Sequence, residues 1–262
     1  MDVNVVALLC RTSDRSGGGA QGALALAQEL ARRRGVEAQV VGEPGEPREG
    51  DWRDDLRDAR GCLLEAGGQV DDALAAGAYP ILLSSECSIC MTTLPAVLRH
   101  HPGATILWLD AHGDFNTPDT TASGFLGGMC LAAACGVWDA GFEGPAVDPA
   151  AVVMCGVRDL DGQEKVLLET RGVGVVARPS YLADALRGRK VFVHLDLDVL
   201  DPSVLPAQFP APGGLSDGGL HTLLGEVVGA ADVIGCELTS LERPDLARRV
   251  ATIVEPLLPE TS

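Results

Sequence analysis

The stretch Trp108-Leu109-Asp110-Ala111-His112-Gly113-Asp114-Phe115-Asn116 decides how the rest of the chain is interpreted. It continues an apolar run over residues 105–109 that is typical of a buried parallel strand. In a regular strand Asp110, His112 and Asp114 would point to one side, because side chains alternate along a strand. Three ionisable groups beyond the carboxyl end of a buried strand predict a cation site.

A second apolar run, residues 190–195, ends in the same way, with Asp196, Asp198 and Asp201 following it. Carboxylates from two strand ends would repel one another, and divalent cations remove that repulsion. Mostly oxygen ligands with one imidazole favour Mn²⁺ or Mg²⁺ over a structural zinc ion. We therefore expect one or two divalent ions, preferably manganese. The alternative is that each Asp only caps a strand end and starts a loop.

Composition narrows the class of protein. The chain has 262 residues, 46% of them hydrophobic, and lacks an evident linker, which predicts one α/β domain over residues 1–262. Its net charge of -17 argues against nucleic acid or an anionic membrane surface as a partner. Neither a long apolar run nor a basic N-terminal segment is seen, so we expect a cytoplasmic protein.

Apolar runs alternate with amphipathic segments along the chain, which predicts a three-layer α/β/α sandwich with a mainly parallel central sheet. The expected strands are residues 3–9, 38–41, 79–83, 105–109, 152–157, 173–176, 190–195 and 233–237. The expected helices are residues 20–34, 51–76, 91–100, 127–135, 162–170, 181–186, 217–230 and 245–258. Ligands of such sheets bind at the carboxyl ends of the strands, where both acidic clusters fall.

The two acidic motifs, Asp-Ala-His-x-Asp and His-x-Asp-x-Asp-x-x-Asp-Pro, resemble in this order those of the arginase/agmatinase (ureohydrolase) family, from about Leu82 to Glu237. The resemblance implies an α/β fold in which two manganese ions activate water to hydrolyse a guanidino group. It also implies the metal ligands, which are Asp110, His112, Asp114, Asp196, Asp198 and the residue at position 87.

Position 87 departs from the family, whose Gly-Gly-Asp-His-Ser segment reads Ser-Ser-Glu-Cys-Ser here, so that Cys87 replaces a histidine. A bound thiolate makes the ligand set more negative, and the cysteine thiol must lose its proton in order to bind. We expect the first metal position to hold its ion more weakly. The alternative is that Cys87 and Cys90 form a redox pair, which explains none of the carboxylates. The other six cysteines are expected to be core thiols: Cys10, Cys62, Cys130, Cys135, Cys155 and Cys236.

The loop after the central motif is similar to the arginase branch of the family. By that match Asn116, Thr121 and Ser123 would bind the head group of an α-amino acid. Two residues differ, because the family's Asn is Phe125 here and its proton-shuttling His is Gly127. Arginine is therefore expected to be a poor substrate.

Further downstream, residues 156–164 resemble an arginase segment that places Asp161 on the substrate ammonium group, with Glu164 assisting. Glu237 matches a glutamate that pairs with the guanidinium. The catalytic residues implied are then Glu237, which orients the substrate, and Asp114, which passes a proton to the departing amine.

These departures favour a less basic guanidino amino acid. A metal-site cysteine with arginase-like loops resembles the family's hydroxyarginine hydrolases of antibiotic biosynthesis, which implies Nω-hydroxy-L-arginine as substrate and ornithine and hydroxyurea as products. One alternative is an agmatinase-type enzyme on another guanidino compound, and a second is a non-catalytic member with a binding role. The family resemblance also allows a homo-oligomer.

Overall fold

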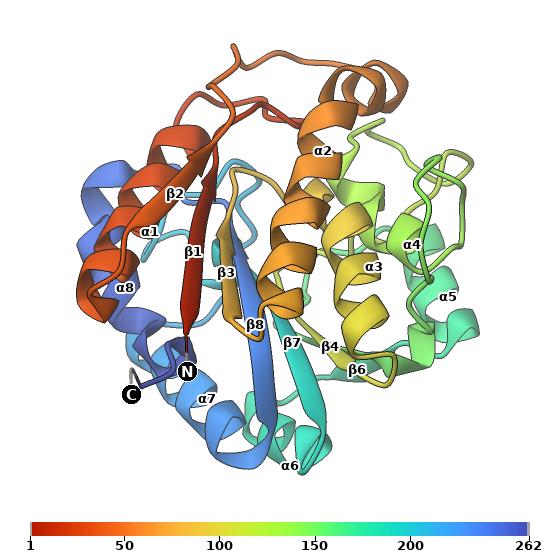
Figure 1. The fold of residues 1–262 in the computed structure, drawn as a ribbon. Helices are drawn as coiled ribbons and strands as arrows, with labels where there is room; N and C mark the ends of the chain where they lie inside the picture. Colours follow the sequence, from red (N-terminus) through yellow and green to blue (C-terminus); the bar gives the residue numbers. More distant parts are fainter. Residues whose placement is uncertain (1, 261–262) are drawn as a thin grey trace.

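The computed structural model describes residues 2–260 and contains one sheet of eight strands, all parallel, in the order β2-β1-β3-β8-β7-β4-β5-β6 (Figure 1). The strands are β1 Val3–Leu8, β2 Ala38–Val41, β3 Tyr79–Leu83, β4 Thr105–Leu109, β5 Val152–Cys155, β6 Gly174–Val176, β7 Lys190–Asp196 and β8 Asp232–Thr239. The expected parallel sheet is confirmed.

Helices cover both faces of the sheet (Figure 1). They are α1 Gly19–Arg34, α2 Trp52–Ala75, α3 Cys90–His100, α4 Cys130–Ala134, α5 Gly162–Arg171, α6 Leu182–Leu186, α7 Asp217–Ala230 and α8 Ala247–Ile253. Helices α1, α6, α7 and α8 share one core with the sheet, and α2, α3, α4 and α5 share the other. The expected three-layer fold is therefore confirmed.

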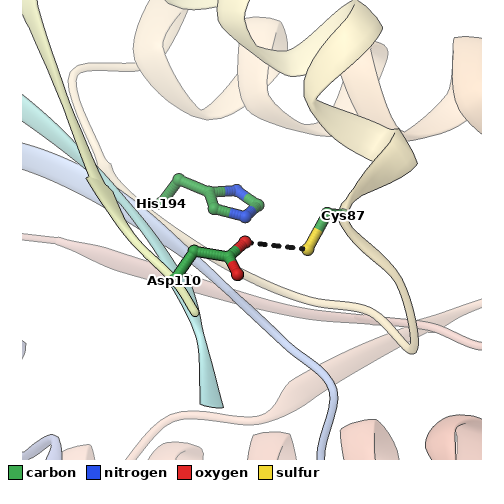
Figure 2. A group of neighbouring side chains, drawn as sticks. All are labelled: Cys87, Asp110 and His194. Atoms are coloured by element: carbon green, nitrogen blue, oxygen red, sulfur yellow. Dashed lines mark hydrogen bonds between the residues drawn. The ribbon is translucent and has the colours of Figure 1, made fainter. Parts of the chain in front are cut away.

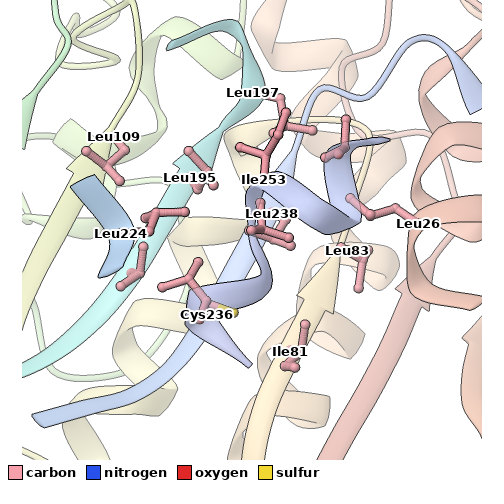
Figure 3. Close-up of a cluster of buried hydrophobic side chains, with 14 of the residues drawn as sticks. Leu26, Ile81, Leu83, Leu109, Leu195, Leu197, Leu224, Cys236, Leu238 and Ile253 are labelled. Carbon is pink, nitrogen blue, oxygen red and sulfur yellow. The ribbon is translucent and has the colours of Figure 1, made fainter. Parts of the chain in front are cut away.

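The central strands are apolar along their whole length because both of their faces are covered. Every residue of β3 and β4 is buried, and so is every residue of β7 after Lys190. Figure 3 shows part of the core under α1, α7 and α8, where Leu83, Leu109 and Leu195 from three strands lie among helix side chains. The well-packed centre of the sheet fixes the strand ends that carry the acidic residues.

Two expected helices are shorter than the sequence suggests. Residues 127–129 form a 3₁₀ turn before α4, and α8 ends at Ile253 before a second turn over residues 255–257. Pro256 explains the second difference, because proline has no N–H to donate and its ring clashes with the preceding helical turn.

The cysteine expectation is wrong at two positions. Cys10, after β1, and Cys62, in α2, form a disulfide across 52 residues of sequence. They meet because α2 packs beside β1, a tertiary contact that local sequence does not report. The four other expected core thiols are free and buried, and they are Cys130, Cys135, Cys155 and Cys236. Within residues 2–260 no helix has the length and apolarity that crossing a bilayer requires.

Candidate metal centre

The two acidic segments meet because β4 and β7 are neighbours in the sheet. Leu109 pairs with Leu195, so the residues that follow each strand leave the sheet side by side. Four buried carboxylates gather there, from Asp110, Asp114, Asp196 and Asp198. They line a cavity of about 280 Å³ at the carboxyl edge of the sheet.

A turn brings the residues of the central motif together, where alternation along a continuing strand was expected. β4 ends at Leu109, and Asp110 Oδ1 accepts a hydrogen bond from the His112 backbone N–H at 2.7 Å. Asp114 adopts a left-handed conformation, with φ of 49°. Such a conformation is uncommon for residues other than glycine, although Asp tolerates it better than most.

One corner of the cluster is made of Asp110, His112 and Asp198, whose ligand atoms lie within 4.8 Å of one another. His112 Nδ1 is 2.9 Å from Asp198 Oδ2 and 3.4 Å from Asp110 Oδ1. Burial lowers the pKa of His112, but hydrogen bonds with Asp110 and Asp198 outweigh it and raise the pKa to about 12. The corner therefore attracts positive charge strongly. We call it the outer corner, because the His112 side chain is 24% exposed.

The second group consists of Cys87, Asp110 and His194, again with ligand atoms within 4.8 Å (Figure 2). Cys87 Sγ lies 3.9 Å from Asp110 Oδ2 and 2.8 Å from Asp196 Oδ2. We call this group the inner corner, because all three residues and Asp196 are buried. Cys87 and Cys90 are both free thiols, so the structure shows no disulfide of the kind that a redox pair would form.

The electrostatics of the cluster fit divalent cations. Burial, followed by the charge of Asp198, raises the pKa of Asp196 to about 6. Burial and the charge of Asp110 raise the pKa of Asp114 well above its usual range. Burial, Asp196 and Asp110 do the same to the pKa of the Cys87 thiol. These carboxyl and thiol groups are difficult to ionise side by side because their negative charges repel one another. Bound metal ions would remove that repulsion, since their positive charge favours the ionised forms.

The cavity brings together most of the expected substrate residues. Asn116, Ser123, Asp161 and Glu164 all line it. Asn116 Nδ2 donates to Asp161 Oδ2 at 3.2 Å. Glu164 accepts hydrogen bonds from the backbone N–H groups of Phe115, at 2.8 Å, and Asp161, at 3.3 Å. Burial raises the pKa of Glu164 to about 7, although these two N–H groups oppose the shift.

Thr121 differs from its expected place. It lies outside the set of residues that line the cavity, and its hydroxyl accepts a hydrogen bond from the Gly124 backbone N–H at 3.1 Å. Its geometry is that of a residue that shapes the loop.

Glu237 also differs from the expectation that it holds the guanidinium. It is fully buried in β8 and does not line the cavity. One carboxylate oxygen is 2.7 Å from His194 Nδ1, and the other accepts from Thr93 Oγ1 at 2.6 Å. The physical reason is strand register, since Glu237 pairs with His194 in the neighbouring strand. In this structure the Glu237 carboxylate contacts His194 and Thr93 and is outside the set of residues that line the cavity.

Sequence reasoning missed several residues of the cavity wall. Glu86 was detectable as the neighbour of Cys87, and its carboxylate accepts from Gln208 Nε2 at 2.9 Å. Gln208 and Phe209 belong to a Pro- and Gly-containing loop with no recognisable motif. Asp159 and Ser240 complete the missed polar wall.

Phe125 and Gly127, the two departures in the substrate loop, are linked in space. The Phe125 ring lies 4.7 Å from the Phe209 ring, and the Arg15 guanidinium lies 4.8 Å from the Phe125 ring centre. A Cβ atom at position 127 would approach the Phe125 ring to 2.5 Å. Phe125 therefore occupies space that any side chain at position 127 would need.

Comparison with known proteins agrees with this geometry. A model of the arginase family matches residues 48–253. The Nω-hydroxy-L-arginine amidinohydrolase of Streptomyces lavendulae is 36% identical over 95% of this chain and 92% of its own length. The arginase of Bacillus caldovelox is 33% identical over 63% of this chain and 61% of its own length.

Solved structures give the same result. The arginase structure from Bacillus caldovelox superposes with a TM-score of 0.82 at 25% identity, covering 100% of this chain and 99% of that one. The proclavaminate amidino hydrolase of Streptomyces clavuligerus, at 21% identity and a TM-score of 0.71, covers 98% of this chain and 91% of that one and shows the shared fold alone. The chain belongs to the arginase family and is a hydrolase of the C–N bonds of amidines.

Proposed function

We propose that this enzyme hydrolyses Nω-hydroxy-L-arginine to ornithine and hydroxyurea with two manganese ions. The observation that carries the proposal is Cys87, whose sulfur lies 2.8 Å from Asp196 in the inner corner. A thiolate beside carboxylates weakens the Lewis acidity of an ion there, which suits a less basic guanidino group. The similarity to the Streptomyces lavendulae amidinohydrolase supports the same substrate.

Six residues would hold the ions: Cys87, Asp110, His112, Asp114, Asp196 and Asp198. Two bound manganese ions would supply positive charge and a water of lowered pKa for attack on the guanidino carbon. Asp110 belongs to both corners, so it is placed to connect the two positions.

Asp114 is the residue placed to move a proton. Its carboxyl is buried at the cavity wall, among the carboxylates that would hold the ions. A carboxyl beside the reacting centre can take up a proton and deliver it to the departing amine, ornithine. Gly127, where the family resemblance implies a shuttling histidine, offers no side chain for this task.

Acidic and amide groups at the rim fit the amino acid end of the substrate. Asp161 supplies the charge for the α-ammonium, and Asn116, which donates to it at 3.2 Å, fixes its position. Ser123 provides a hydroxyl at the same rim. Phe125 and Phe209 form an apolar wall across the cavity. A polar rim and an apolar wall favour an amino acid whose zwitterionic head group binds at the rim and whose long side chain reaches the metal positions.

Ornithine release from Nω-hydroxy-L-arginine and from L-arginine, measured side by side after manganese loading, tests the proposal. We expect a higher kcat/KM for the hydroxylated substrate. In Cys87→His the preference should fall by about tenfold, equivalent to about 1.4 kcal/mol of differential barrier. Asp161→Ala should raise KM for both substrates. A higher kcat/KM for L-arginine than for its hydroxylated form would refute the substrate assignment.

A further inference from the structure

We infer that His194 is a seventh metal ligand and supplies to the inner corner the imidazole nitrogen that Cys87 removes from it. This inference rests on the proposed metal function, because it concerns a residue that faces the same ions. It adds a ligand from β7 itself, two residues before Asp196, to the six that the motifs predict.

The His194 ring is held rigidly inside the protein. In the sheet Trp108 pairs with His194 and His194 pairs with Glu237, so three neighbouring strands place these side chains in one row. The Trp108 ring stacks on the imidazole with centroids 3.6 Å apart and planes 5° from parallel. Both residues are 0% exposed. A side chain fixed this way cannot turn its nitrogens elsewhere without disturbing the core.

The two ring nitrogens have different surroundings. Nδ1 lies 2.7 Å from Glu237 Oε1, and Glu237 is itself fixed by Thr93 at 2.6 Å. A carboxylate at that distance keeps a proton on Nδ1, which leaves a lone pair on Nε2 of the neutral ring. Within residues 2–260, Nε2 is buried and has no hydrogen-bond partner. Buried polar atoms are rarely left unpaired, so an unsatisfied acceptor beside a cluster of metal-binding groups is placed to bind a cation.

The position of the ring agrees with that conclusion. Figure 2 shows His194 beside the Asp110 carboxylate and across from the Cys87 sulfur. One ligand atom from each lies within 4.8 Å of the other two. Two ligand atoms on opposite sides of one ion lie up to about twice the metal–ligand distance of about 2.0–2.3 Å apart. The upper limit of 4.8 Å here is close to that spread, so a small inward adjustment of the side chains would let one ion contact all three. A histidine whose other nitrogen is bound to a carboxylate is the usual arrangement at metal sites.

Nitrogen coupling to bound Mn²⁺, measured by pulsed electron paramagnetic resonance, tests the inference directly. His112→Asn removes the imidazole of the outer corner, and we expect a ¹⁴N coupling to remain in that variant. The coupling should vanish in His112→Asn/His194→Gln and persist in the matched control His112→Asn/His101→Gln, since His101 lies at the opposite end of α3 from the cluster. A coupling that is absent from His112→Asn with bound manganese, or unchanged by His194→Gln, overturns the inference.

Metal affinity gives a second readout by equilibrium dialysis. His194→Gln should weaken one of two bound ions by about 10–100-fold and leave the other unchanged, as expected for the loss of a supporting imidazole. Glu237→Gln keeps the His194 ring and alters only its orientation, so we expect a smaller loss of affinity for the same ion. This variant tests the inference if His194→Gln does not fold. Equal affinities in all three proteins overturn the inference.

The result separates this inference from the proposed function. Two bound ions and hydroxyarginine hydrolysis, with no nitrogen coupling from His194, overturn the inference alone. Failure of the wild-type protein to bind manganese overturns both.

Discussion

The inner and outer corners of the candidate metal centre share Asp110 but are built differently. The inner corner draws Cys87 from the 3₁₀ turn that follows β3, Asp110 from the residue after β4 and His194 from within β7, and all three are buried. The outer corner pairs His112, which follows β4 and is 24% exposed, with Asp198. Sheet register places His194 of the inner corner, whereas Cys87, His112 and Asp198 lie in turns beyond the strands.

This difference suits the proposed function, in which the substrate differs from arginine and the hydrolytic chemistry is kept. The outer corner retains the family's histidine and aspartate, so the resemblance covers it fully. The inner corner departs at Cys87, and the compensating imidazole that we propose comes from a neighbouring strand.

Removing the shared ligand should disable both corners at once. Asp110→Asn is expected to lose both ions and to reduce hydrolysis at least about 1000-fold, equal to about 4 kcal/mol of barrier. Metal content and ornithine release measure the two effects. The matched control is Asp232→Asn, because Asp232 is exposed and begins β8 at the end of the strand far from the cluster. This variant should keep both ions. Retention of two ions by Asp110→Asn would show that Asp110 is not shared.

Removing one ligand from each corner should separate them. His112→Asn and Cys87→Ser are each expected to bind about one manganese ion in place of two, with a loss of activity of about 100-fold, or about 3 kcal/mol. The ion that remains should differ, because Cys87→Ser leaves the outer corner intact. Cobalt substitution distinguishes them, since a sulfur-to-metal absorption band is expected in His112→Asn alone. The same spectrum in both variants would contradict two separate positions.

The buried acids predict how stability depends on pH. Asp196 has a pKa of about 6 in the folded protein and Glu164 one of about 7, both above their ordinary values of 3.8 and 4.5. A group with a raised folded pKa adds stability below its unfolded pKa, and this is lost as pH rises through the folded value. Chelator-treated protein should therefore lose stability between about pH 4 and pH 7 from these groups.

Thermal melts at pH 5 and pH 8 check this expectation. With chelator present, ionisation of Asp196 and Glu164 should make Tm about 5–10 °C lower at pH 8 than at pH 5. Manganese should raise Tm more at pH 8 than at pH 5, because ionised ligands are available. Asp196→Asn should shrink the difference between the two pH values. An equal effect of manganese at both pH values would contradict the assignment.

The smallest effect is expected at the cavity wall. Gly127→Ala forces a Cβ against Phe125 and should raise KM several-fold, equal to about 1 kcal/mol. In a Phe125→Leu background the same change should cost less, because the ring atom that it meets at 2.5 Å is gone. Steady-state kinetics of the four proteins measure the coupling. Independent effects on KM would show that the two positions do not interact.

Much of this architecture follows from local sequence patterns. The apolar runs at residues 105–109 and 190–195 match β4 and most of β7, because buried parallel strands need apolar residues on both faces. The acids beyond them meet because parallel strands end at one edge of a sheet. Metal ligands at strand ends are accordingly the easiest part of such a site to recognise.

The remaining features depend on contacts between distant segments. Glu237 matches a substrate-binding motif, but its pairing with His194 across 43 residues turns its carboxylate away from the cavity. The bond between Cys10 and Cys62 depends on the placement of α2. Phe209 reaches the cavity from an irregular loop that has no periodic pattern. Registers and loop paths of this kind are set by the whole fold.

The contact between Phe125 and Gly127 has a consequence for evolution. Steric coupling ties the two positions together in evolution. A Cβ at position 127 comes within 2.5 Å of the Phe125 ring, so a larger residue there needs the ring to shift or a smaller residue at position 125. A histidine at position 127 is therefore accommodated more easily when Phe125 changes as well.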